Sequence, residues 1–137
     1  MTRRDLRELA LLRLNEAKTP LRNGHYDGAY YLSGYIIECA LKACIAKRTQ
    51  RHEFPDKKTA DASHTHGLED LLRVAQLSDV HREQARANLA FEANWNLVRD
   101  WSELSRYRRH SREAAEAILS AVSDKRHGVL KWIKQHW

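Results

Sequence analysis

The 137-residue chain has the length of one domain, residues 1–137, and is long enough to enclose a hydrophobic core. Its hydrophobic content of 42% and charged content of 31% are those of a globular protein, and they argue against a membrane protein and exclude a wholly disordered chain. Twenty-four Lys and Arg against 18 Asp and Glu give a net charge of +6, which predicts an anionic partner.

Apolar residues recur at steps of three and four, and the chain has only 5 Gly and 2 Pro, so we expect it to be almost entirely helical. A first helix is predicted over residues 5–23, kinked near its end by Pro20 and ended by Gly24. A second helix, over residues 27–48, is the most apolar and therefore central. Small residues that would let a neighbouring helix approach closely occupy three of its positions: Ala29, Ser33 and Gly34.

The two cysteines, Cys39 and Cys44, both fall in the second predicted helix. Their Cα atoms would lie about 8 Å apart there, so they cannot form a disulfide with each other. The start of the chain has no signal-peptide pattern, and no apolar stretch reaches about 18 residues. We therefore expect a reduced, cytoplasmic protein.

Residues 49–65 are expected to form an exposed loop, because they contain Pro55 and a polar run. A short helix over residues 66–75 follows, with Ser63 or Thr65 as its N-cap.

A long helix is predicted over residues 80–107, capped by Ser78 or Asp79. Its apolar face runs through five residues: Leu89, Ala93, Leu97, Trp101 and Leu104. Ser111 caps a further helix that continues to Ser123, and an amphipathic stretch closes the chain. These elements predict an all-α fold, an antiparallel up-down bundle of four main helices with short accessory helices.

Glu38 has an unusual position for a carboxylate, because apolar residues flank it on both sides in the central helix. A carboxylate buried there needs a cation or several hydrogen-bond donors. Lys42, four residues later on the same helix, is one candidate partner. Arg106 of the long helix is the other, as an ion pair between helices. The sequence leaves both alternatives open.

The densest group of charges ends the long predicted helix. Arg99, Glu103, Arg106 and His110 follow one another at steps of four, three and four, which places them on one face if the helix continues that far. Two arginines and a histidine there suit a phosphate group, since Arg binds phosphate bidentately and His transfers protons. The alternative is a solvated face in which Glu103 pairs with the arginines.

The stretch Arg106-Tyr107-Arg108-Arg109 places an aromatic ring among phosphate-binding charges. Candidate contacts to phosphate or nucleic acid are therefore Arg99, Arg106, Tyr107, Arg108 and Arg109. His64 and His66 supply two nitrogen ligands but no third ligand at a recognisable spacing, so we expect no metal and no cofactor. His66 is expected to help begin its helix. The four tryptophans are expected to anchor the core or an interface: Trp95, Trp101, Trp132 and Trp137.

The order of these motifs resembles the HEPN domain family, small helical bundles found beside minimal nucleotidyltransferases and in RNA-cleaving toxins. The resemblance rests on residues 28–35 with Glu38-Cys39-Ala40-Leu41-Lys42, and on a set of later residues: Phe54, Pro55, His66, Leu68, Leu71, Leu72, Trp95, Trp101, Arg106, Tyr107 and Trp137. It implies a homodimer, with a nucleotidyltransferase as partner in a toxin–antitoxin-like pair.

Many ribonucleases of that family use an arginine and a histidine separated by four to six residues. No histidine of this chain stands at that spacing; Arg106 and His110 come nearest, with three residues between them. A shifted pair is poorly placed to meet one phosphate together.

Three functions follow from these residues. The first is a nucleotide- or RNA-binding module without the family's ribonuclease pair. The second is a metal-independent endoribonuclease in which His110 is the general acid or base and Arg106 stabilises the pentavalent phosphate. The third is a structural module held by a buried Glu38–Arg106 pair that acts through protein contacts.

Overall fold

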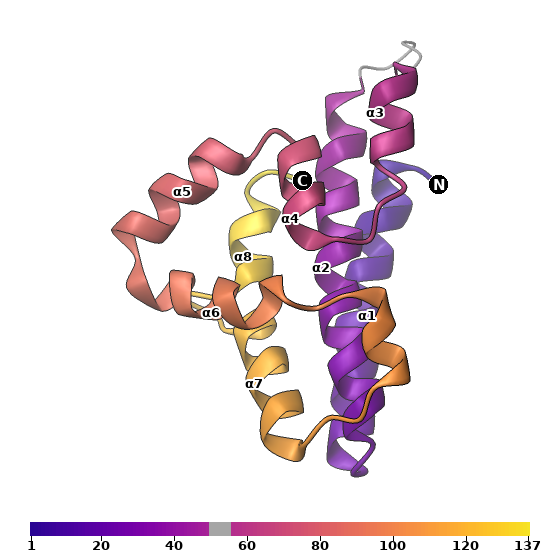
Figure 1. Cartoon of the computed structure of the whole chain (residues 1–137), viewed down its shortest axis with the longest axis vertical. Helices are drawn as coiled ribbons and strands as arrows, with labels where there is room; N and C mark the ends of the chain where they lie inside the picture. The colour runs from indigo at the N-terminus through magenta and orange to yellow at the C-terminus, as the bar shows by residue number, and fades with distance from the viewer. Residues whose placement is uncertain (50–55) are drawn as a thin grey trace.

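The computed structural model of the chain describes residues 1–49 and 56–137. Within those residues it contains helices and no strand, which confirms the all-α fold (Figure 1). The elements are α1 (Arg3–Arg22), α2 (Tyr26–Arg48), α3 (Lys57–Ala62), α4 (Leu68–Val74), α5 (Ser78–Ala87), α6 (Leu89–Arg99), the 3-10 helix η1 (Glu103–Tyr107), α7 (Arg112–Ser123) and α8 (Val129–Lys134).

Helices α1 and α2 form a long antiparallel pair, and both match the ranges expected from the sequence to within two residues. Thr2 and Asp5 form a capping box at the start of α1. Pro20 lies inside the last turn, and its carbonyl oxygen accepts a hydrogen bond from the His25 backbone N–H at 2.7 Å. The connection turns at Gly24, whose φ of +77° favours glycine.

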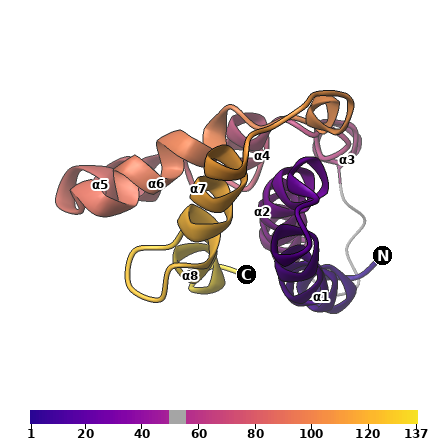
Figure 2. The ribbon, with the colours of Figure 1, turned by 90° about the horizontal axis from the view of Figure 1, so that it is seen from below.

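Helix α2 is the centre of the molecule, as its apolar sequence predicted. Half of its 23 residues are buried, and it contacts α1, α4, η1, α7 and α8. Figure 2 shows α2 with α1 on one flank and α7 and α8 on another. Both cysteines of α2 are buried and free, which confirms the expectation that they form no disulfide.

The predicted long helix over residues 80–107 is wrong. Asn88 has an extended backbone, with φ −139° and ψ 97°, and its side-chain oxygen accepts a hydrogen bond from the Phe91 N–H at 3.0 Å. It therefore ends α5 and caps α6, which itself ends at Arg99. The chain then turns into η1. The break changes which residues face the core.

The expected apolar face of that helix is correspondingly wrong at four of its five positions. Leu89, Ala93, Leu97 and Leu104 are exposed. The buried residues of this region are instead Phe91, Trp95, Val98 and Trp101. All four tryptophans of the chain are buried, as expected of core anchors.

The loop predicted over residues 49–65 contains helix α3. Asp56 caps it: one carboxylate oxygen accepts from the Lys58 N–H and the other from the Thr59 hydroxyl, each at 2.8 Å. Residues 50–55, with Phe54 and Pro55 of the resemblance, lie outside the described part of the chain.

The expected caps of two other helices have different outcomes. Helix α4 begins after Gly67, and the expected cap Thr65 instead accepts a hydrogen bond from the Gly67 N–H at 3.3 Å. Ser111 caps α7 as predicted, by accepting a hydrogen bond from the Ala114 N–H at 3.1 Å.

The close approach predicted at the small residues of α2 occurs at Gly34, but its partner is a side chain. A Cβ atom at Gly34 would lie 2.1 Å from the Trp101 indole, so only glycine leaves room for this ring. Trp101 is the residue before Ser102, the N-cap of η1. Its docking against α2 therefore fixes where η1 begins.

Among the described residues, no helix is long and apolar enough to cross a bilayer.

Candidate functional site

The candidate site is the segment of residues 106–112, which we call the arginine segment because four of its seven residues are arginine. It leaves η1 and leads into α7, beside the N-terminal half of α2 (Figure 1). The sequence predicted that the excess positive charge gathers here. Five of the 16 arginines of the chain fall between residues 99 and 112.

His110 makes the contacts that hold the arginine segment against α2. Its imidazole stacks on the Tyr30 ring, with ring centroids 3.7 Å apart and an angle of 7° between the planes. Its backbone N–H donates to the Asp27 carboxylate. Its ring nitrogen Nε2 lies 3.3 Å from the Ser105 carbonyl oxygen. Because a carbonyl only accepts, Nε2 carries the hydrogen of this bond, and only Nδ1 is left without a partner among the described residues.

Three arginines of the segment have no anionic partner among the residues that the structure describes. Within residues 1–49 and 56–137, no carboxylate lies at salt-bridge distance from Arg106, Arg108 or Arg109, and all three side chains are exposed. The Arg106 guanidinium lies 4.8 Å from the centre of the Tyr107 ring, which is 73% exposed. These groups are therefore open to an anion and to a stacking ring.

The other two arginines of this region are already paired. Arg99 Nε lies 3.6 Å from a Glu69 carboxylate oxygen and 3.8 Å from one of Asp100. Arg112 Nε lies 2.7 Å from a Glu116 oxygen. Arg99 is thus a weaker candidate for phosphate binding than the sequence indicated, because its charge is met within the protein.

The start of α2 contributes a cavity of about 330 Å³ to this site. Residues 24–28, from the connection before α2 and its first turn, line one side, and Arg109 and His110 of the arginine segment line the other. His25, the N-cap of α2, makes no side-chain hydrogen bond to the helix. The positive end of the α2 dipole and the Arg109 charge therefore act on the same cavity, where the Asp27 carboxylate opposes them.

The pKa of the Tyr30 phenol depends on charges beside the stacked histidine. Partial burial raises its pKa, the Asp100 carboxylate raises it further, and the Arg108 guanidinium opposes the rise. Arg108 thus acts on the side of α2 that His110 covers.

The expected shared face of Arg99, Glu103, Arg106 and His110 does not form, because α6 ends at Arg99. Among the described residues, no hydrogen bond joins the Arg106 guanidinium to the His110 imidazole. Arg106 lies against Tyr107, whereas His110 lies against Tyr30. The two candidates for catalysis are thus held by different neighbours.

Glu38 is 2% exposed, as its apolar flanks predicted, but its partners correct the expected pair with Arg106. One carboxylate oxygen lies 3.3 Å from Lys42 Nζ and also contacts His66 Nδ1. Lys42 was one of the two partners considered. The Glu38–Arg106 pair does not form, because Arg106 is exposed on η1 and turned toward Tyr107.

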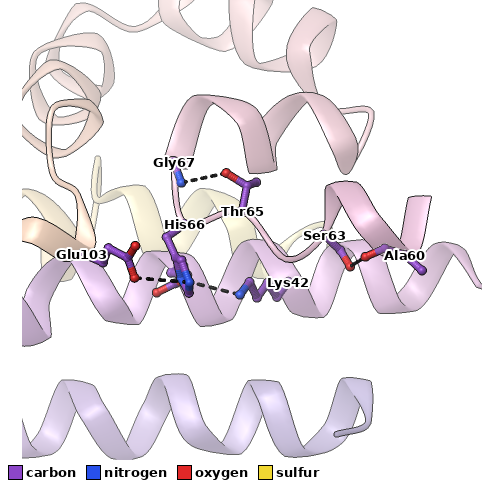
Figure 3. Close-up of polar contacts among 8 residues, drawn as sticks. Lys42, Ala60, Ser63, Thr65, His66, Gly67 and Glu103 are labelled. Atoms are coloured by element: carbon purple, nitrogen blue, oxygen red, sulfur yellow. Dashed lines mark hydrogen bonds and ion pairs between the residues drawn. The ribbon is translucent and has the colours of Figure 1, made fainter. Parts of the chain in front are cut away.

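His66 is the residue that sequence reasoning assigned wrongly, as a starter of α4. It lies between two carboxylates: Nδ1 contacts Glu38, and Nε2 lies 3.3 Å from a Glu103 oxygen (Figure 3). Nothing local marks this role, since Glu38 is 28 residues earlier and Glu103 is 37 residues later. Within the described residues, no three His, Cys, Asp or Glu side chains are grouped to hold a metal ion.

Comparison with protein families gives a match over almost the whole chain. The family model of the HEPN domain matches residues 4–135, from the second residue of α1 to one residue beyond α8. A search of curated proteins and a search of solved structures gave no match.

Proposed function

Because the chain belongs to the HEPN domain family, we propose that it is a binding module for nucleotide or RNA phosphate and that the arginine segment is its contact surface. Membership supports a nucleotide- or RNA-related module. The observation that carries the rest is the set of three exposed arginines, Arg106, Arg108 and Arg109, that lack a carboxylate partner among the described residues.

The chemistry of these side chains suits a flexible polyanion. An arginine binds a phosphate through two parallel hydrogen bonds, and neutralising phosphates releases counterions, which favours binding at low salt. Tyr107 stands between two of the arginines and is 73% exposed, so an unpaired base can stack on it. Such stacking contributes about 1–3 kcal/mol per base. The proposed ligand is therefore single-stranded RNA, or a nucleotide, in preference to a duplex.

We propose that the module binds RNA without cleaving it. The endoribonuclease alternative needs the His110 imidazole to exchange a proton with the reacting oxygen, within hydrogen-bond reach. The His110 ring is stacked on Tyr30 with Nε2 toward the Ser105 carbonyl, whereas the Arg106 guanidinium that would stabilise the phosphate lies against Tyr107. The endoribonuclease alternative is tested by incubating mixed RNA with the protein in EDTA. Cleavage that His110→Ala abolishes in a folded protein would contradict the binding-only form.

The test of the binding surface compares two triple variants of equal charge. Arg106→Ala, Arg108→Ala and Arg109→Ala are combined in one protein. Lys125→Ala, Arg126→Ala and Lys131→Ala are combined in the other. These three side chains are exposed and come after the C-terminal end of α7. The arginine segment leads into the N-terminal end of α7, and the helix is about 18 Å long.

Fluorescence anisotropy with a labelled single-stranded RNA measures both affinities at low salt. We expect the first variant to lose about tenfold or more, since three phosphate contacts are removed, and the second to lose much less. Equal losses would mean that the +6 charge acts as a whole and would refute the site. Family membership also leads us to propose a homodimer and a nucleotidyltransferase partner. Sedimentation of the same samples tests the homodimer, and co-purification with a nucleotidyltransferase tests the partner.

A further inference from the structure

His66 connects the buried centre of the molecule to η1, the element from which the arginine segment continues. It lies between α3 and α4, outside both helices. Its Nδ1 contacts the carboxylate of Glu38 on α2, and its Nε2 lies 3.3 Å from the carboxylate of Glu103, the first residue of η1. Figure 3 shows Glu103 and Lys42 on opposite sides of His66. One side chain thus joins two elements that are far apart in the sequence.

The number of protons on the ring decides whether both contacts are hydrogen bonds. A carboxylate only accepts, and a neutral imidazole has a single N–H. A neutral His66 therefore donates to Glu38 or to Glu103, but not to both. Only the imidazolium donates to both, and such charge-assisted bonds are about twice as strong as neutral ones.

Charged groups face the His66 ring from two elements. From α2, Glu38 and Lys42 face the ring, and from η1, Glu103 does, so a charged His66 balances two carboxylates with two cations. Both carboxylates of α4 form ion pairs with arginines. Glu69 lies 3.6 Å from Arg99 Nε, and Asp70 lies 2.8 Å from Arg73. Loss of the His66 proton leaves Glu38 and Glu103 with Lys42 as their one cation in this group.

We propose that His66 is a proton-dependent positioning residue for the arginine segment. In its charged form it ties Glu103, and through η1 the arginines, to the buried Glu38 on α2. When it is neutral, the link to Glu103 weakens and η1 is held by fewer contacts. This inference rests on the proposed function, because it predicts that RNA binds more tightly at pH 5.5 than at pH 8.0.

The experiment uses two histidine variants of the full chain. His66→Gln keeps one amide donor but does not titrate. His64→Gln is the matched control, since His64 lies two residues away and contacts neither Glu38 nor Glu103. RNA affinity is measured at both pH values at constant salt. We expect the ratio of the affinities at pH 5.5 and pH 8.0 to fall at least threefold in His66→Gln and to stay as in wild type in His64→Gln. Equal ratios in all three proteins would overturn the proposal.

A second measurement does not depend on RNA. The backbone N–H of Ser105 donates to Ser102 O at 2.9 Å, and that of Arg108 donates to Ser105 O at 3.1 Å, so both amides report whether η1 is formed. Their hydrogen-exchange protection, corrected for the intrinsic pH dependence, should decrease from pH 5.5 to 8.0 in wild type and not in His66→Gln. If the protein fails to bind RNA but shows this difference, the proposed function is wrong and the role of His66 stands. If protection does not depend on His66, its role is refuted.

Discussion

Replacement of Gly34 by alanine tests how the arginine segment is anchored. The added Cβ would lie 2.1 Å from the Trp101 indole, and carbon atoms in contact normally lie about 3.5–4.0 Å apart. The ring must therefore move by about 1.5 Å. Trp101 is 2% exposed, so neighbouring side chains surround the ring on its other sides.

The expected free-energy change is the difference between two effects. Overpacking a core costs about 1–3 kcal/mol, and we take the upper end because the indole is enclosed. Alanine in place of glycine within a helix contributes about 1 kcal/mol of stability. The Gly34→Ala variant should therefore be less stable by about 2 kcal/mol.

Gly28→Ala is the matched control in the same helix. Its Cβ would lie 3.9 Å from its nearest neighbour, the Pro20 Cβ, which is an ordinary contact. This variant should equal or exceed the stability of wild type. Urea unfolding followed by circular dichroism measures all three proteins. If Gly34→Ala proves as stable as Gly28→Ala, the reasoning is refuted. A smaller cost of Trp101→Leu in the Gly34→Ala background than in wild type would attribute the loss to this ring.

Three further predictions concern the rest of the fold. Burial lowers the pKa of His81, whose ring lies among Phe91, Trp95 and Trp132, so the folded state binds this proton less tightly and stability should fall as pH drops below about 6.5. His81→Phe should reduce that fall between pH 7.5 and 5.5 in urea unfolding; an unchanged fall would contradict it. Asn88→Ala should cost about 1 kcal/mol through loss of the α6 cap, whereas Asn88→Asp should retain most stability; equal stability of Asn88→Ala and wild type would refute the cap. Burial raises the pKa of both the Cys39 and the Cys44 thiol to about 11, so a thiol reagent at pH 8 should label neither in the native protein and both after denaturation; rapid native labelling would contradict this.

The elements that could be predicted from sequence are those with local signals. Helices α1 and α2 have apolar periodicity and are separated by Gly24, which takes the positive φ that ends the first helix. The cap of α7 by Ser111 depends on residues within three positions of each other. Asp56 begins α3 in the same way, but the polar sequence that follows it resembles a loop as closely as it resembles a short exposed helix.

The break at Asn88 could not be recognised from the apolar pattern. Leu89, Leu97 and Trp101 continue the helical spacing through it, although only Trp101 is buried. Asn occurs both in helix interiors and at caps. Here the hydrogen bond that its side chain accepts from the Phe91 N–H makes Asn88 a cap. An error at this one residue placed Arg106 and His110 on a helix face that does not exist.

The partners of Glu38 illustrate a second limit. Burial of Glu38 follows from its apolar neighbours, and Lys42 follows from helical spacing. His66 lies 28 residues away across a segment without regular periodicity, so its contact depends on the path of the chain. The order of residues along the chain predicted that the arginines of residues 106–109 form one group, but only the structure identifies the neighbours of each.

The salt dependence of RNA binding tests the central claim, contact of Arg106, Arg108 and Arg109 with phosphate, most directly. For single strands, each neutralised phosphate contributes about 0.7 to the slope of log K against log salt concentration. The triple alanine variant should therefore show a slope shallower than that of wild type by about 2. Identical slopes in the two proteins would contradict the claim.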